Sequence, residues 1–466
     1  MSLPRYYGRS FAGQLDLPQT ADTAILAIHC PYSLVNSEAT YGTVANPIDM
    51  AATVAPVKDD ASPHLRRTTV WFMAASTGVV VANIYYIQPL LGIIAHAFGL
   101  TATGAGAIAM TTQVGTCFGM LLFVPLGDSH ERRSLITWML VGAMIALVLT
   151  ALARNALWLA LASFGIGIMG ATVHVFVPFA AHLAPPKDRG RVVGTVFSGI
   201  LLGILLARSF SGFVGAHLGW RAVYGIAAIL ILFVCVFVQF FLPRSEPTAK
   251  LPYFSLLKST VSLAREHAAL RESALFGSAA FCCFSAFWTT LVFLLERAPY
   301  HYRYPAQAAG LFGLVGAAGA AGAPIVGRLA DRRGPRYTIG FSLILLLVSY
   351  IVLGVTGKLL FGLIVGVLLM DFGTQACHVS NQTRIYGLAP DARSRLNMFY
   401  MVCYFAGGAV GSILGAYAWR LYGWPGVCTF CSGVMILMLL KFVFLGATTP
   451  LAHHATAPDE SPISEF

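Results

Sequence analysis

Twelve long apolar stretches constrain the fold of this chain more than any other feature. Each is close to the length of about 20 residues that an α-helix needs to cross a bilayer. Of the 466 residues, 57% are hydrophobic and 11% are charged, and the mean hydropathy is +0.73. A soluble domain carries about 25% charged residues, so the composition excludes a soluble globule as well as a disordered chain. The stretches predict an all-α integral membrane protein with twelve transmembrane helices, at residues 71–94, 103–126, 134–153, 156–179, 192–214, 222–242, 274–295, 306–327, 338–356, 359–380, 396–418 and 425–446.

Lysine and arginine residues predict the orientation of these helices. Most of them lie in the loops after the second, fourth, eighth and tenth stretches and in the segment between the sixth and seventh. Cytoplasmic loops carry the positive excess in membrane proteins, so both termini are expected in the cytoplasm. Topology then accounts for the net charge of +11, and no nucleic-acid partner is expected, because the basic residues are spread over separate short loops.

An internal repeat predicts that the chain consists of two halves. Three short runs recur 203 to 205 residues later: 126–128 (LGD) as 329–331 (LAD), 183–185 as 388–390 (both LAP), and 219–220 as 423–424 (both GW). We expect two six-helix bundles, over 70–242 and 274–446, related by a parallel pseudo-two-fold repeat. A cytoplasmic linker over 243–273 joins them. Residues 1–69 are expected to be a cytoplasmic extension, with Met50 as an alternative start, and 447–466 a cytoplasmic tail.

One loop resembles the signature of a known family. Residues 327–336, between the eighth and ninth stretches, read GRLADRRGPR. This run resembles the loop that marks the major facilitator superfamily of transporters. Its copy in the first half, VPLGDSHERR, keeps the aspartate and two arginines but has Glu131 where the second glycine belongs. The resemblance implies that both loops help to gate the inward side. The gating residues would be Asp128, Arg132, Arg133, Gly327, Asp331, Arg332, Gly334 and Arg336.

Further runs are similar to the drug-efflux-like branch of that superfamily, the drug:proton antiporters of bacteria. They are NIYYIQPLL (83–91), SGILLGILLARSFSG (198–212) and NQTRIYGLAPDARSRLNM (381–398). The glycine spacing around the second run resembles the antiporter motif of the fifth span, from which it departs by placing Arg208 where the motif has proline. The resemblance implies a monomeric secondary transporter in the bacterial inner membrane.

A polar stripe crosses the tenth stretch. Asp371, Gln375, His378 and Gln382 follow one another at helical spacing, so they share one face. Because a charged group facing lipid is costly, this face is expected to line the transport cavity, or else to form a hydrogen-bond ladder between helices. Asp371, near the middle of the membrane, is the first choice for taking up and releasing the coupling proton.

Two histidines occupy equivalent places in the repeat. His174 and His378 lie 204 residues apart, and each is followed by valine. They are expected to face each other across the pseudo-two-fold axis, where a histidine could share the proton. A purely structural role is the alternative. Two histidines without a third ligand predict no metal site.

Besides Asp371, Arg208 is the other charged residue that we single out within a stretch. It is expected to attract an anionic substrate or to balance a carboxylate, the alternative being that its long side chain reaches the membrane interface. Other polar residues in the stretches are expected to line the substrate cavity with it. They are Asn83, Tyr86, Gln88, Gln113, Trp288, Gln375, Asn381 and Gln382.

The sequence predicts a transporter rather than an enzyme. No nucleophile, base and oxyanion set converges, and no phosphate-binding loop is present, so no cofactor is expected. We expect efflux of a small organic molecule across the lipid bilayer in exchange for protons. The alternatives are proton-coupled import of a small metabolite or organic anion, and a non-transporting membrane receptor or scaffold.

Overall fold

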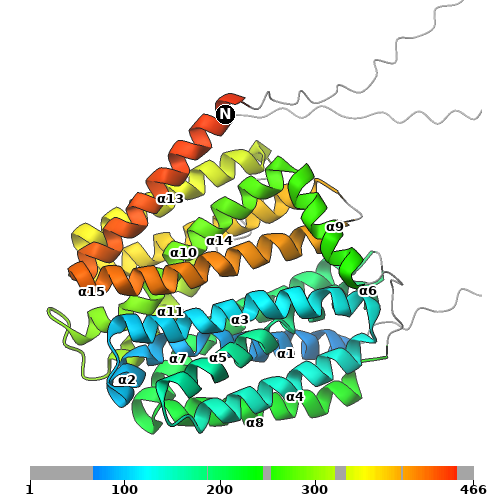
Figure 1. Ribbon diagram of the computed structural model, residues 1–466, viewed down its shortest axis with the longest axis horizontal. Helices are drawn as coiled ribbons and strands as arrows, with labels where there is room; N and C mark the ends of the chain where they lie inside the picture. Colours follow the sequence, from blue (N-terminus) through cyan, green and yellow to red (C-terminus); the bar gives the residue numbers. More distant parts are fainter. Residues whose placement is uncertain (1–66, 186, 245–252, 321–331, 390–391, 449–466) are drawn as a thin grey trace, which may run out of the picture. The chain divides into compact units, whose positions relative to one another are not determined.

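The structure is a computed structural model that describes residues 67–185, 187–244, 253–320, 332–389 and 392–448. Within these ranges the chain forms helices and no strand (Figure 1). The helices are α1 (Arg67–Tyr85), α2 (Ile87–Phe98), α3 (Ala102–Ser129), α4 (Arg132–Ala151), α5 (Ala156–Gly170), α6 (Val173–Leu183), α7 (Arg189–Leu218), α8 (Trp220–Phe241), α9 (Tyr253–Glu266), α10 (Ala268–Glu296), α11 (Pro305–Ala320), α13 (Pro335–Thr356), α14 (Leu360–Tyr386) and α15 (Arg393–Thr448).

Ten segments of the described chain are long and apolar enough to cross a membrane. Two of them join consecutive helices, α1 with α2 over Arg67–Phe98 and α5 with α6 over Ala156–Leu183. A third, Arg393–Phe444, holds the last two predicted spans. The predicted span 306–327 begins as α11, and its remainder lies outside the described residues. Each predicted span thus has a helix at its place in the chain, and the all-α membrane fold is confirmed.

The backbone repeats at the start of the last helix of each half. Gly219 precedes α8 with a φ of 85°, and Gly423 interrupts α15 with a φ of 61°. Glycine adopts such positive values readily, whereas side chains with a β-carbon rarely do. A buried tryptophan follows each glycine, Trp220 and Trp424. The repeated Gly-Trp pair of the sequence therefore marks the same helix break in both halves.

Two arginines of the predicted gating loops make equivalent contacts in the two halves. Arg133, at the start of α4, donates from Nη2 to the carbonyl of Gln239 at 2.6 Å and from Nη1 to that of Leu242 at 3.1 Å. Arg336, at the start of α13, donates from Nη2 to the carbonyl of Phe442 at 3.4 Å. Both arginines thus satisfy carbonyls near the end of the last helix of their own half. Each of these two arginines thus links two helices of its own half by hydrogen bonds, while its role in gating remains a prediction.

The helix that follows the first loop begins differently from the helix that follows the second loop. Gly334, before α13, has a φ of 85°, which suits glycine. The equivalent Glu131 has an ordinary φ of −63°, and its carboxylate accepts hydrogen bonds from the backbone N–H groups of Arg133 at 3.0 Å and Ser134 at 2.7 Å. A side-chain cap of this kind satisfies free donors at a helix start. Glu131 therefore begins α4 by a different device from the glycine that begins α13.

Helices of the two halves contact each other along two lines. On one line α3 packs along α15, and Figure 1 shows them side by side. On the other line α7 packs against α11, where a β-carbon on Gly212 would strike the carbonyl of Ala306 and one on Gly310 would lie 2.6 Å from the carbonyl of Arg208. Small residues permit this close approach of membrane helices. The contact of α7 with α11 is therefore tight enough to bring Arg208 against the second half.

The predicted linker 243–273 contains a helix of its own, α9, whose Tyr253 hydroxyl donates to the carbonyl of Leu121 in α3 at 2.9 Å. Helix α10 begins at Ala268, earlier than the predicted span at 274. The extension before residue 67 and the tail after residue 448 lie outside the described residues. The limits of the two halves and of the linker therefore remain predictions.

Candidate functional site

Arg208 of α7 is buried among aromatic side chains and one amide. It is 2% exposed. Its Nε donates to Oε1 of Gln88 at 2.9 Å, and its guanidinium lies 3.9 Å from the centre of the Trp288 ring. The rings of Phe284 and Tyr85 lie 5.2 and 5.3 Å away. Such distances are typical of cation–π contacts. The alternative that Arg208 reaches out to the membrane interface is therefore wrong.

Asp371 of α14 lies against the same face of α11 as Arg208. A β-carbon on Gly316 would lie 2.7 Å from Oδ2 of Asp371, and one on Gly313 would lie 2.9 Å from Cβ of Arg208. Residues three apart on a helix are neighbours on one face. Because α11 has glycine at both positions, Asp371 of the second half and Arg208 of the first half can pack against adjacent turns of this helix.

The two charges interact without direct pairing. Arg208 and Asp371 interact electrostatically, but the described chain shows no ion pair between them. Nη2 of Arg208 and Oδ2 of Asp371 are both buried and lack a hydrogen-bond partner among the described residues. A buried polar atom without a partner is costly. A substrate group that accepts from the arginine, or one that donates to the carboxylate, would therefore satisfy an atom that lacks a partner among the described residues.

The two histidines lie within electrostatic reach of each other. Nδ1 of His378 is 3.1 Å from the Tyr400 hydroxyl, and the His378 ring is 4.8 Å from that of Tyr404. His174 packs edge to face against Phe405, with ring centres 6.4 Å apart. The two histidines thus lie near each other, while their facing each other across the pseudo-two-fold axis and their role in proton coupling remain predictions.

An aromatic wall connects the charged pair to the histidines. From Trp288, beside Arg208, ring contacts run to Phe284 at 6.1 Å, then to Phe281 at 5.5 Å and to Tyr404 at 4.1 Å. Tyr404 in turn contacts His378. Small-molecule sites are mostly lined by apolar and aromatic side chains with a few polar groups. This wall, with a charged pair at one end and a histidine at the other, has that composition.

Gln113 joins the two halves instead of standing in an open cavity. Its Nε2 donates to Oγ of Ser285 at 2.6 Å and to Oγ of Ser412 at 3.4 Å. The two serine hydroxyls are 2.8 Å apart, and Thr289 donates to Ser412 at 3.3 Å. All four residues are buried. Sequence reasoning missed the serines, because a hydroxyl in an apolar helix bonds its own backbone as readily as a distant partner.

Three other predicted cavity residues, Asn83, Asn381 and Gln382, have hydrogen-bond partners away from Arg208 and Asp371. Asn83 donates to the carbonyls of Val79 and Val80 in its own helix, both at 3.2 Å. Asn381 is fully buried and donates to the carbonyl of Cys377 at 2.8 Å. Gln382 of α14 donates to Oδ1 of Asn397 at 3.2 Å, and Gln375 is half-buried on the face that Asp371 and His378 share.

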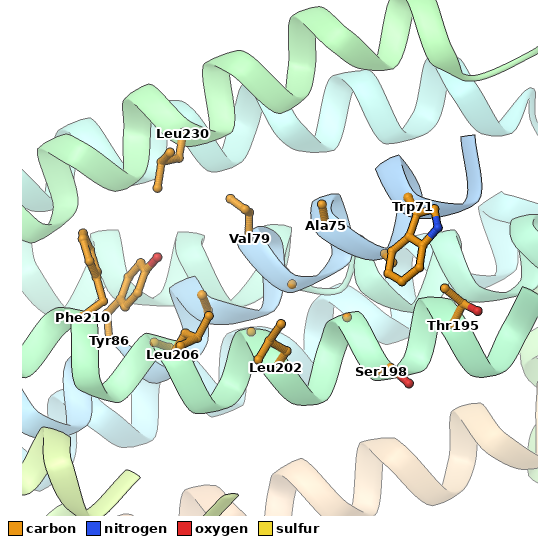
Figure 2. A pocket seen from close by; sticks show the side chains of 16 residues that line it. Trp71, Ala75, Val79, Tyr86, Thr195, Ser198, Leu202, Leu206, Phe210 and Leu230 are labelled. Carbon is orange, nitrogen blue, oxygen red and sulfur yellow. The ribbon is translucent and has the colours of Figure 1, made fainter. Parts of the chain in front are cut away.

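Tyr86 lies at the end of a groove between α1, α7 and α8. The groove has a volume of 570 Å³. Figure 2 shows Tyr86 and Phe210 at one end and Trp71 and Thr195 at the other. The rings of Tyr86 and Phe210 are 5.7 Å apart. Tyr86 is therefore separate in its contacts from Gln88, although the two are close in sequence.

A second cavity, of 720 Å³, lies further along the same helices that carry Gln88, Arg208 and Trp288. Its lining includes His96, Ala216 and Glu296, which follow Gln88, Arg208 and Trp288 by eight residues each. Eight residues of helix span about 12 Å. Nε2 of His96 and Oε2 of Glu296 are 3.6 Å apart, so this cavity contains a contact between the halves that the sequence analysis did not predict.

The remaining residues of the gating loops are only partly described. Nε of Arg132 donates to the carbonyl of Gly127 at 2.9 Å, and Arg332 is exposed. Asp128 lies in α3, but its side chain is outside the described part of the structure. Gly327 and Asp331 lie outside the described residues. The described residues therefore do not test whether the two loops contact each other, and the gating role remains a prediction.

Comparison with known proteins identifies the family. The sequence model of the Major Facilitator Superfamily matches residues 73–369 and 305–465. The chain belongs to the Major Facilitator Superfamily. It is therefore a multi-pass membrane transporter and not an enzyme.

Relatives and solved structures agree with this assignment. The chain is 41% identical over 377 residues to "Uncharacterized transporter YgaY" of Escherichia coli O157:H7, which covers 81% of this chain and 95% of that protein. It is 34% identical over 370 residues to "Probable transporter SCO4007" of Streptomyces coelicolor, covering 78% and 84%. The crystal structure of the nucleoside transporter NupG (D323A mutant) matches with a TM-score of 0.68 at 11% identity, over 81% of this chain and 99% of that one. At that identity the likeness shows the fold alone.

Proposed function

We propose that this transporter moves a small organic molecule outward across the inner membrane in exchange for protons, and that Asp371 carries the coupling proton. One observation carries the proposal: Asp371 and Arg208 come from different halves, lie against the same glycine face of α11, and each have one buried polar atom without a partner among the described residues. Ionisable groups inside a membrane protein are functional candidates because their burial is costly.

The arrangement suggests how coupling would work. When the halves rock past each other, the distance from Asp371 to Arg208 changes, and with it the stability of the ionised carboxylate. A proton on Asp371 and a substrate bound beside it then bias the same equilibrium between the two access states. If substrate and proton compete for this place, each enters on the side where the other leaves, which is antiport.

The test is substrate-driven proton release from energised inside-out vesicles, followed with a pH-sensitive dye. Antibiotics, dyes and small metabolites are added to vesicles that contain the native protein, Asp371→Asn, or the control Glu266→Gln, an exposed carboxylate of α9. We expect some compounds to release protons with the native protein and the control but not with Asp371→Asn. Equal release with all three proteins would remove Asp371 from the coupling path.

A second candidate, import of an organic anion together with a proton, is supported by Nη2 of Arg208, for which the described part of the chain offers no hydrogen-bond partner. An anion bound to Arg208 adds a negative charge to a site that already holds a carboxylate, so protonation of Asp371 would restore the charge balance. Anion and proton would then move in the same direction. Accumulation of an anion in right-side-out vesicles, with proton uptake, would favour this candidate over efflux.

A further inference from the structure

The groove between α1, α7 and α8 is a surface feature that the proposed transport function does not use. Its floor is made of small residues, because α1 and α7 touch at their backbones: a β-carbon on Gly203 would strike Gly78. Its walls are apolar side chains that remain accessible, with Leu202 54%, Leu206 50% and Leu230 37% exposed. Since these helices cross the membrane, the groove opens toward the bilayer.

The two ends of the groove differ in chemistry. One end is closed by the aromatic pair of Tyr86 and Phe210. At the other end, shown in Figure 2, lie Trp71, which is 59% exposed, and the hydroxyl residues Thr195 and Ser198. Tryptophan is enriched where membrane proteins meet the headgroup region. The groove therefore runs from the hydrocarbon core to a polar mouth.

Two arginines lie one turn beyond this mouth on the same helices. Arg67 precedes Trp71 by four residues in α1, and Arg191 precedes Thr195 by four residues in α7. Both arginines are exposed, and the Thr195 hydroxyl donates to the carbonyl of Arg191 at 2.9 Å. Residues four apart lie above one another on a helix. The mouth is thus flanked by positive charge from both helices that form the floor.

We infer that this groove binds one anionic phospholipid, with an acyl chain between Leu202, Leu206 and Leu230 and the phosphate near Arg67 and Arg191. The match lies in the sequence of environments, because a phospholipid also passes from an apolar chain to an interfacial region and then to a negative headgroup. Basic residues at the membrane surface attract anionic lipid. A purely apolar occupant would leave the two arginines without a role in binding.

The experiment uses the full chain in nanodiscs of phosphatidylethanolamine and phosphatidylglycerol, followed by release into the gas phase and native mass spectrometry. We expect one phosphatidylglycerol to stay bound to the native protein. Replacing both arginines, Arg67→Gln with Arg191→Gln, should lower the preference for phosphatidylglycerol over phosphatidylethanolamine by about twenty-five-fold, from about fivefold for each basic residue near a membrane surface.

A second variant tests the groove itself. Ala75, an exposed residue of its lining, is changed to Phe or, if that protein is poorly folded, to Leu. Filling the groove should release lipid of either headgroup. The matched controls are Val236→Phe, on the exposed face of α8 outside the groove, and the double change Lys258→Gln with Arg265→Gln on the exposed face of α9.

Each outcome decides the inference. It is supported if the arginine pair removes the headgroup preference, Ala75→Phe removes retention, and both controls keep native lipid binding. It is overturned if phosphatidylglycerol stays bound in both test variants, if the controls lose it equally, or if the retained mass is a transported compound or a free fatty acid. Proton-coupled transport is measured separately, so failure here leaves the proposed function untouched.

Discussion

Arg208 and Asp371, which both lie against α11, allow one quantitative prediction by double substitution. Arg208→Gln removes the cation–π contact with Trp288, worth about 2 kcal/mol when desolvated, and a charged hydrogen bond to Gln88, worth about 1.5–3 kcal/mol. It also leaves Asp371 without its opposite charge. Removing one partner of a buried ion pair costs about 3–5 kcal/mol. Because Arg208 and Asp371 do not touch directly, we expect Arg208→Gln to lower the free energy of unfolding by about 3 kcal/mol, at the lower end of that range.

The double variant carries the argument. Asp371→Asn alone leaves a buried cation, and Arg208→Gln alone leaves a buried carboxylate, whereas the double variant leaves neither. We therefore expect the double variant to lose less stability than the sum of the two single variants, by about 1–3 kcal/mol of interaction energy.

Thermal unfolding can be followed with a thiol-reactive dye, because each cysteine that the structure describes is buried or half-buried and becomes reactive on unfolding. Losses that add without any interaction would refute the charge coupling of Arg208 and Asp371. A loss in Arg208→Gln as large as in a truncation of Trp288 alone would instead assign the effect to the aromatic contact.

Three further predictions concern separate contacts. Gly316→Ala should reduce proton-coupled transport at least about tenfold, because a β-carbon there meets the carboxylate of Asp371; unchanged transport would show that the contact is not used. Glu296→Gln should remove the charge contact with His96, so a cysteine introduced at Ala216, in the lining of the same cavity, should react faster with a thiol reagent than it does beside the native Glu296; equal rates would show that this contact does not restrict access to the cavity. Arg336→Gln should remove one partly buried hydrogen bond and so lower the free energy of unfolding by about 1 kcal/mol, seen as a lower thermal midpoint. Native expression of the variant would show that folding is retained.

The fold could be predicted from sequence because membrane helices are specified by length and apolarity alone. The repeat went further: the paired Gly219 and Gly423 predicted equivalent positions, and the structure shows a positive φ at both. It also predicted that His174 and His378 face each other across the axis, and the structure shows that the two residues interact electrostatically, while their facing remains a prediction.

The site was less predictable because side-chain partners are decided between helices. Arg208 was identified as an unusual residue, but its contacts with Gln88 and Trp288 depend on how three helices cross. Asn83 and Asn381 were expected in the cavity on their polarity, yet their amides bond their own helices. A single sequence gives no signal that distinguishes an amide turned inward on its helix from one that meets a substrate.

The hydrogen bonds around Gln113 have a mechanical consequence for the interface. One amide from the first half faces a row of hydroxyls from the second half, of which Ser285 and Ser412 lie within its reach. As one half turns against the other, the amide can pass from one hydroxyl to the next, and the hydroxyls can pair with each other in the meantime. The hydrogen bonds of this arrangement can therefore exchange one at a time during such a rotation. The amide of Gln113 and the serine hydroxyls then never lose all of their hydrogen-bond partners at once.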